Sequence, residues 1–413
     1  MSLPYFKQFG WEPTVICVDE KFVQGFRDPL LNFTIPNDIK IYKVKALPFN
    51  ITKKLGVGSI SLRSFPYFKK KGNEILRKEK FDLIYFSTTA FHVCWLGVYW
   101  KKKFNVPFII DVQDPWRNDY YLDKPRSERP PKFFISYKID KYLESKTIPK
   151  ADGIISVSEK YCEIFMQRYP QMRAVQFKVI AFGASYLDLE TMEKFVKTSQ
   201  HIKFCNDKFN AVYIGRGGYD MHFAMEIIFK AFKLGLKDLP EVFDKVHFSF
   251  VGTDYASGGK KTIEPLAQKL QIAEYVTEVT DRIPFFEALF LLKKADMLIV
   301  PGSIDDAYTA SKIYPYILAE RPLIAVFNKN SSVINVLKNV GYGNSIIQFD
   351  NAGSADEYIN ECCTKFHEIL SNSNSNIHLD KNTFEPYSAK ARTKSQTDFF
   401  DAVINQNIDI PAC

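Results

Sequence analysis

One segment, residues 295–328, fixes much of what this chain can fold into. It reads ADMLIVPGSIDDAYTASKIYPYILAERPLIAVFN. Its first apolar run, residues 297–300, is too short for a helix and has the composition of a buried parallel strand. A Pro-Gly pair ends that strand, a helix is expected over 312–320, and a second apolar strand over 322–327. The segment therefore predicts a strand–loop–helix–strand unit, the repeating element of a parallel α/β sheet.

The loop of this unit lies at the carboxyl end of its first strand, where ligands bind in open α/β sheets. Ser311 is expected to cap the following helix, and Lys312 to stand in its first turn. Free N–H groups, a hydroxyl and an ammonium together suit an anion such as a diphosphate. A solvated lysine is the alternative, but a first-turn lysine opposes the helix dipole, so binding is the preferred interpretation.

Strand-like and helical segments alternate along most of the 413 residues. Further strands are expected at 15–18, 39–44, 81–86, 107–111, 153–157, 177–180, 209–214, 246–251, 275–279 and 345–348. Helices are expected at 66–79, 91–104, 133–148, 221–235, 262–271, 284–294 and 331–339. The alternation breaks over a polar stretch at 186–208. We therefore predict an α/β protein with two doubly wound domains, 1–185 and 186–385, and a C-terminal helix within 386–413 that packs back toward the first domain.

Composition narrows the class of protein. Hydrophobic residues make up 46% and charged residues 25% of the chain, as in ordinary globular proteins. The seven cysteines and six histidines are scattered without redox or metal-ligand spacing, which indicates a reducing compartment and no bound metal. The longest apolar run, 91–100, is too short to span a bilayer. A cytoplasmic protein without a cofactor and without a nucleic-acid partner is expected.

Basic residues are concentrated in the first third of the chain, although the net charge is only +8. Lysines cluster at 69–80 and at 101–103, with aromatic residues between them. Such clusters are usually solvated faces. They also suit binding of an anionic acceptor, or peripheral contact with the anionic inner face of a membrane. Membrane contact is a secondary expectation.

A glycine-rich loop, IGRGG at 214–218, follows the first strand of the second domain and precedes a helix. Its glycines allow backbone N–H groups to approach a phosphate, and Arg216 can pair with a phosphate through two hydrogen bonds. An ordinary turn is the alternative, because a lone glycine cluster is a weak signal. Lys312, which is expected at the end of another strand of the same sheet, strengthens the interpretation that this loop binds a phosphate.

Three polar residues follow strand ends in the first domain. His92 begins a helix after the strand at 81–86, where it can exchange a proton, bind a sugar hydroxyl, or simply pack under Trp95. Asp111 and Asp114 flank the end of the next strand. A carboxylate there can orient hydroxyls or act as a base, whereas Asp114-Pro115 also fits a capping turn. A functional role is expected for at least one of the two aspartates.

Several segments together resemble a known enzyme family. They are FGWEPTVICVDE (9–20), ADGIISVSE (151–159), VIAFGAS (179–185), IGRGG (214–218), FVGTD (250–254) and SKIYPYILAERPLIAV (311–326). In that order they resemble the landmarks of a family 4 glycosyltransferase. NVPFIIDVQDPW (105–116) is similar to the "giPwiaDfrDPW" stretch of one bacterial branch. The resemblance implies a GT-B fold, with two Rossmann-like domains, and a retaining, metal-independent transfer.

The resemblance also implies residue roles. The donor-binding candidates are Gly215, Arg216, Gly217, Arg282, Ser311 and Lys312; the catalytic candidates are His92, Asp111 and Asp114. Two departures stand out. Where many members carry Glu-x7-Glu, this chain has Ala307 and Pro315, with Asp305 or Asp306 as a substitute for the first Glu. The lysine usual after the glycine loop is replaced by the stretch 219–222.

The predicted function is a glycosyltransferase that moves a sugar from a nucleotide sugar to a cell-surface polysaccharide or lipid-linked acceptor. A GT-B-fold nucleotide-sugar epimerase is one alternative. A non-catalytic nucleotide-sugar-binding protein is the other, and the missing Glu-x7-Glu keeps it open. Product analysis separates the three hypotheses.

The N-terminus carries a further expectation. A Rossmann-like domain begins with a strand and a glycine-rich loop, whereas residues 3–10 read as the end of a helix. A missing central strand would leave buried backbone groups unpaired. We therefore expect the natural gene to encode about 15–30 further residues before Met1.

Overall fold

The computed structural model describes the chain apart from residues 26, 55–57, 118, 123–124, 127–128, 130–132, 255–257, 306–310, 373–376, 378 and 407–413. The chain forms two compact units. The C-terminal unit comprises Met1, Phe26–Ile35 and Phe182–Ala391, and the N-terminal unit comprises Ser2–Gly25, Pro36–Ala181 and Arg392–Cys413. Within the described ranges, every helix is too short or too polar to cross a bilayer.

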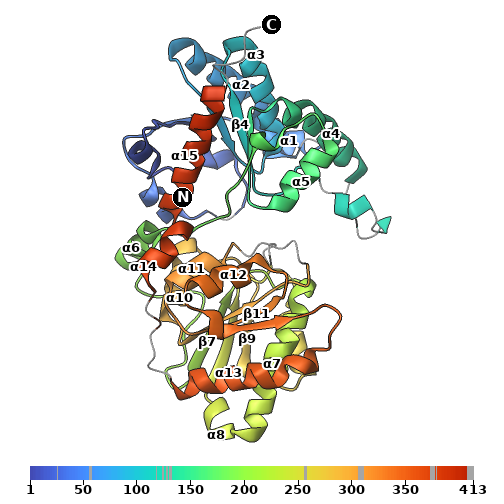
Figure 1. Ribbon diagram of the computed structural model, residues 1–413, viewed down its shortest axis with the longest axis vertical. Coiled ribbons are helices and arrows are strands. Elements are labelled where there is room, and N and C mark those ends of the chain that lie inside the picture. Colours follow the sequence, from blue (N-terminus) through green and yellow to red (C-terminus); the bar gives the residue numbers. More distant parts are fainter. Residues whose placement is uncertain are drawn as a thin grey trace. The chain divides into compact units, whose positions relative to one another are not determined.

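The C-terminal unit is built on one six-stranded parallel sheet (Figure 1). Its strands are β7 (Phe209–Ile214), β8 (Val246–Val251), β9 (Val276–Val279), β10 (Met297–Pro301), β11 (Leu323–Asn328) and β12 (Ile346–Phe349). The strand order is β12-β11-β10-β7-β8-β9. The chain therefore moves outward in one direction from β7 to β9, and in the other from β10 to β12. The direction changes between β7 and β10, which is where doubly wound sheets bind ligands.

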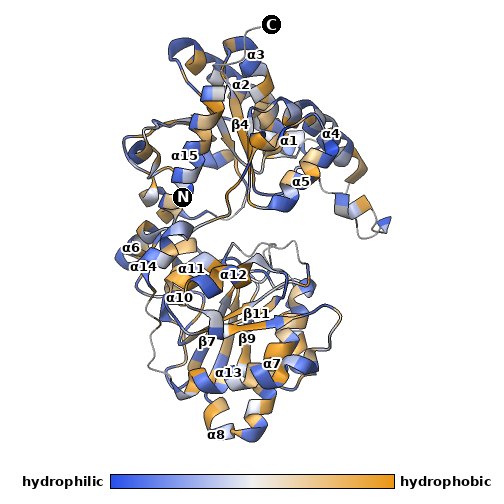
Figure 2. Ribbon diagram, in the orientation of Figure 1, coloured by the Kyte–Doolittle hydropathy of each residue, from blue (hydrophilic) through white to orange (hydrophobic). Residues whose placement is uncertain are grey.

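Helices cover this sheet. They are α6 (Tyr186–Phe195), α7 (His222–Asp238), α9 (Ile263–Lys269), α10 (Phe285–Lys294), α11 (Ile313–Leu318), α12 (Ser332–Asn339) and α13 (Ile359–Ser371). Every residue of β10 and β11 is buried, and β11 is among the most hydrophobic segments in Figure 2. Continuous apolar strands of this kind are expected where both faces of a parallel sheet are covered. α7 and α13 pack side by side (Figure 1).

The strands of the N-terminal unit form two separate parallel sheets. β3 (Ile84–Ser87), β4 (Phe108–Val112), β5 (Gly153–Ser156) and β6 (Phe177–Val179) pair in chain order. β1 (Thr14–Val18) pairs with β2 (Lys40–Val44). Among the strands of the described ranges, β1 bonds to β2 alone and β3 to β4 alone. The expectation about residues before Met1 stays a prediction.

Helices also cover the four-stranded sheet. They are α2 (Ile60–Lys78), α3 (Trp95–Phe104), α4 (Phe133–Thr147), α5 (Glu159–Arg168) and α15 (Ala389–Gln406). Phe399 and Phe400 of α15 join a core cluster with Ile109 and Ile155 of the two central strands. A Cβ at Gly153 would lie 2.8 Å from the Phe399 ring, so a glycine there lets α15 pack this closely on β5.

Candidate functional site

The loops that follow β7 and β10 lie at the point where the strand order of the C-terminal unit changes direction. β10 pairs with β7 only through Met297 and Leu298. Beyond them, the Tyr316 hydroxyl on α11 accepts a hydrogen bond from the Ile214 N–H (2.6 Å) and donates one to the Ile214 carbonyl (3.1 Å). This tyrosine therefore satisfies the backbone of β7 where strand pairing ends.

Lys312 is held against the end of β7. Its Nζ donates a hydrogen bond to the Tyr213 hydroxyl (2.5 Å) and lies 4.6 Å from the centroid of that ring. Burial, together with the positive charge of Arg216, lowers the pKa of Lys312 to about 7, although Asp220 opposes the shift. A polyanion bound nearby would raise this pKa again, because it favours the charged ammonium.

Arg216 is paired with an acid of its own loop. Its Nη1 and Nη2 donate to the two carboxylate oxygens of Asp220 at 2.7 and 2.6 Å, and Ser303 donates to the same carboxylate at 2.6 Å. Burial alone would raise the pKa of Asp220, but the hydrogen bonds from Arg216 and Ser303 hold it below its ordinary value. A phosphate has the same two-oxygen geometry as this carboxylate, so a bound phosphate would replace Asp220 or share Arg216 with it.

The N–H groups of Gly215 and Gly217 in the glycine-rich loop are bonded to neighbouring backbone. The N–H of Gly215 donates to the Val251 carbonyl (2.9 Å) and that of Gly217 to the Thr253 carbonyl (2.8 Å). Neighbouring backbone therefore already occupies these two N–H groups, and phosphate binding by the glycine loop stays a prediction. A Cβ at Gly215 would lie 2.4 Å from the Lys312 Nζ. Gly215 instead makes room for the lysine.

Two other predicted donor-binding residues, Ser311 and Arg282, are exposed. Ser311 is exposed and is not the helix cap: Lys312 occupies the N-cap position of α11, and no side chain caps the helix. The predicted cap is wrong because the helix begins one residue later. Arg282 is exposed in the loop after β9, and β8 separates β9 from β7. The structure thus brings together Gly215, Arg216 and Lys312. Asp306 and Ala307 lie outside the described residues.

Sequence reasoning missed four residues around the two cations. Tyr213 contacts Lys312, and Asp220 pairs with Arg216. Ser303 supports Asp220, and Tyr316 binds the backbone of Ile214. Asp220 could have been found, because it lies four residues after Arg216 and that spacing is typical of ion pairs. The two tyrosines gave no signal, because each is nearly or fully buried and reads as an ordinary core aromatic residue.

His92 belongs to the N-terminal unit, and both of its ring nitrogens have partners. Nδ1 lies 2.6 Å from the Ser61 hydroxyl on α2, and Nε2 lies 2.9 Å from the Asp140 carboxylate on α4. Ser61 is buried. The ring therefore links two helices, and a proton transfer to a ligand would require it to release one of these partners. Trp95 stacks on Phe65, with ring centroids 5.9 Å apart.

The two candidate aspartates have different surroundings. Asp111, at the end of β4, is buried and accepts hydrogen bonds from Tyr85 (2.9 Å), Gln113 (3.0 Å) and Ser87 (3.3 Å). Burial raises the pKa of Asp111, and these donors only partly offset the effect. Asp114 is exposed in the following turn. Of the two, Asp114 is the one within reach of a ligand from solvent.

An aromatic contact anchors the loop that carries Asp114. Trp116 stacks on Phe91, with ring centroids 5.4 Å apart, and both rings are buried. Phe91 begins the short helix Phe91–Cys94, which also contains His92. The stack therefore ties the Asp114 loop to the segment of His92.

In the part of the chain that the structure describes, no group of three or more His, Cys, Asp or Glu side chains could hold a metal ion. Metal-independent chemistry stays a prediction.

No protein-family model matches this chain, and no curated protein matches its sequence. Among solved structures, it resembles Anabaena Alr3699/HepE in complex with UDP and glucose (16% identity, 92% of this chain and 90% of that chain, TM-score 0.53). It also resembles a Rickettsia africae glycosyltransferase (13%, 99% and 91%, 0.50) and a UDP-forming alpha,alpha-trehalose-phosphate synthase from Burkholderia vietnamiensis (9%, 85% and 78%, 0.54).

Identities this low show a common fold and no more. These solved structures are GT-B glycosyltransferases, and the two units of this chain contain the parallel sheets and covering helices of that architecture. The protein therefore has the GT-B fold.

Proposed function

We propose that the protein is a family 4 glycosyltransferase that transfers a sugar from a nucleotide-sugar donor to a cell-surface polysaccharide or lipid-linked acceptor. The observation that carries the proposal is the placement of Lys312 and Arg216 beside one glycine loop, where the strand order changes direction. Two cations at this edge of a doubly wound sheet suit the diphosphate of a nucleotide sugar. The Anabaena protein of similar fold, in complex with UDP and glucose, supports a donor of this class.

In this proposal the two cations stabilise the leaving diphosphate. Lys312 takes up a proton as the anion approaches, and Arg216 exchanges the Asp220 carboxylate for phosphate oxygens. Positive charge that is already positioned for the developing negative charge lowers the barrier without a metal ion. His92, Asp111 and Asp114 are proposed to serve the acceptor side, and transfer is proposed to retain the anomeric configuration.

A non-catalytic nucleotide-sugar-binding protein is the second candidate. Pro315 lies inside α11, where related enzymes place a glutamate that contacts the donor. A proline has no side-chain acceptor for that contact. The same phosphate site would then bind the donor without transferring its sugar.

Two measurements test the proposal. A panel of nucleotides and nucleotide sugars should contain at least one ligand that raises the thermal midpoint, because a ligand that binds only the folded state stabilises it. That donor is then incubated with polysaccharide and lipid acceptors, and the products are analysed. A transferred sugar supports the proposal. An epimerised free donor would indicate the epimerase, and binding without turnover would indicate the non-catalytic binding protein.

Variants connect the result to the site. Arg216→Ala or Lys312→Ala should weaken nucleotide binding by about 1.5–3 kcal/mol, the range for hydrogen bonds to charged groups. Lys237→Ala is the matched control, because Lys237 is an exposed lysine of the same unit, in the last turn of α7. Unchanged affinity in both site variants would overturn the placement of the donor.

A further inference from the structure

Helix α4 exposes an apolar stripe. Phe134, Ile135, Ile139 and Tyr142 are 46%, 63%, 39% and 61% exposed. Ile135, Ile139 and Tyr142 follow one another at spacings of four and three residues, so they lie on one face of the helix. Contiguous exposed apolar side chains are unusual on the surface of a globular protein, and they mark a surface that contacts a partner protein, a ligand or a membrane.

A basic cavity adjoins this stripe. Its volume is about 510 Å³, and it is lined by four cationic side chains: Arg117, Lys138, Lys141 and Arg168. Tyr142 of the apolar stripe also lines it. Within the described part of the chain, Lys138 and Lys141 form no ion pair, so both ammonium groups are available to an anion. The cavity and the stripe therefore share one side of α4.

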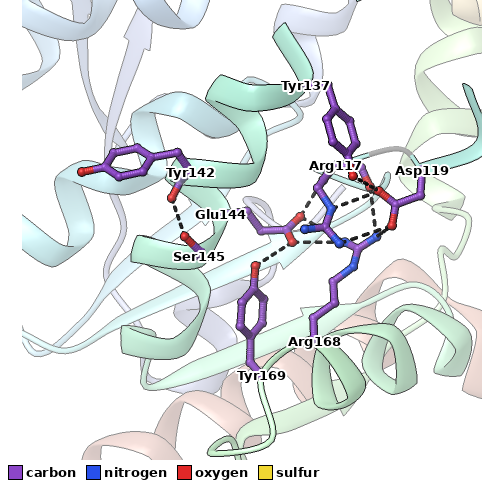
Figure 3. A network of polar contacts seen from close by, with 8 residues as sticks. All are labelled: Arg117, Asp119, Tyr137, Tyr142, Glu144, Ser145, Arg168 and Tyr169. Carbon is purple, nitrogen blue, oxygen red and sulfur yellow. Dashed lines mark hydrogen bonds and ion pairs between the residues drawn. The ribbon is translucent and has the colours of Figure 1, made fainter. Parts of the chain in front are cut away.

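The two arginines are held in position by the carboxylates of Glu144 and Asp119 (Figure 3). The fully buried Glu144 carboxylate accepts hydrogen bonds from Arg168 Nη1 (3.1 Å), from the backbone N–H of Arg117 (3.1 Å) and from the Tyr169 hydroxyl (2.8 Å). Asp119 accepts from both arginines, at 3.0 and 2.7 Å. Four cations against these two carboxylates leave the cluster with a net positive charge. The network fixes the guanidinium groups without neutralising the cavity.

We propose that this cavity binds the phosphate of an anionic membrane lipid, whose hydrocarbon part lies against the Ile135–Ile139–Tyr142 stripe. Guanidinium and ammonium groups are the usual partners of phosphate. Exposed ammonium groups beside exposed apolar side chains suit an anionic lipid surface, because the first attract its charge and the second lie against its hydrocarbon. A soluble phosphoester would use the cations but would leave the stripe exposed. The inference goes beyond the proposed function and does not rest on it.

The test is co-sedimentation of the full chain with vesicles of phosphatidylcholine alone or mixed with phosphatidylglycerol. The wild type should bind the mixed vesicles and not the neutral ones. Lys138→Glu/Lys141→Glu should weaken this binding at least about tenfold, since each basic residue near an anionic surface contributes severalfold in affinity. Ile135→Ser/Ile139→Ser should weaken it as well, because the stripe is removed while the charge is kept.

The matched control is Lys45→Glu/Lys178→Glu. It makes the same charge change at two exposed lysines of the same unit, one after β2 and one in β6, outside the lysine clusters at 69–80 and 101–103. The control should bind vesicles like the wild type. All of these side chains are exposed, so circular dichroism should show folded protein in every variant.

Three results would contradict the proposal that this cavity binds a membrane lipid. Equal losses in the control and in the lysine variant would reduce the effect to net charge and overturn the proposal. Vesicle binding that survives both α4 variants would also overturn it. Release of the wild type from vesicles by millimolar inorganic phosphate at constant ionic strength, with no effect of the isoleucine changes, would assign a soluble phosphate instead. Nucleotide binding is measured in parallel: its absence would refute the donor site alone and leave the vesicle result standing.

Discussion

Lys312 has the most perturbed environment among the candidate site residues. Its pKa is lowered to about 7 by burial and by Arg216, from an ordinary 10.5. The unfolded chain therefore binds more protons than the folded chain between about pH 7 and 10.5, and stability rises with pH through this window. Lys312→Met should remove this contribution. The rise in thermal midpoint from pH 7 to pH 9 should be smaller in the variant than in the wild type, and an identical rise in both would contradict the assigned environment.

His92 is expected to affect both stability and turnover. His92→Ala removes the hydrogen bonds from the ring to Asp140 and to Ser61, whose hydroxyl keeps its contact with Ser59, and should lower the free energy of unfolding by about 1–3 kcal/mol. The proposed acceptor-side role adds a loss of kcat while nucleotide affinity stays nearly intact. Turnover measured well below the unfolding midpoint separates the two effects. Asp114→Asn serves as the comparison because Asp114 is exposed: it should lower kcat without a change in stability.

At the scale of elements, α11 supplies hydrogen bonds to β7 at the point where β7 stops pairing with β10. The Tyr316 hydroxyl is bonded to both backbone groups of Ile214. Tyr316→Phe should lower the free energy of unfolding by about 1–3 kcal/mol, because a partly buried N–H and carbonyl lose their partner. Thermal unfolding measures the change. Tyr219→Phe is the control, since that side chain is 78% exposed and should leave the midpoint unchanged.

Most elements could be predicted from sequence because their signals are local. The apolar run of β10 and the Arg321-Pro322 pair after α11 suffice to place those elements. α2 was predicted to begin at residue 66, but it begins at Ile60 and contains Pro66. Arg63 explains the difference: it is buried and donates to the carbonyls of Leu47 and Phe22, so distant contacts stabilise the first turns.

The candidate site was predictable only in part, for a related reason. Arg216 and Lys312 each follow a strand end, and a parallel sheet brings such ends to one edge. The Asp220 and Tyr213 contacts depend on side-chain positions that no local pattern encodes. The cavity beside α4 depends on residues from three separate segments, so no single stretch of sequence indicates it.

At the scale of the whole molecule, the absence of a metal requirement stays a prediction. Lys312 and Arg216 are expected to stabilise the leaving diphosphate without a divalent ion. Transferase activity should therefore persist in excess chelator. Activity that disappears with chelator and returns with Mg²⁺ or Mn²⁺ would show that the two cations are insufficient.

The division of the N-terminal unit into two sheets has a consequence for its motions. β4 and β5 pair on both sides, whereas β1 and β3 each pair on one side only among the described strands. Backbone N–H groups on an unpaired edge are not protected by a neighbouring strand. In deuterated solvent, amide protons of β1 and β3 should therefore exchange earlier than those of β4 and β5. The interior of the four-stranded sheet would then unfold last, and β1 with β2 would open as the least stable part of this unit.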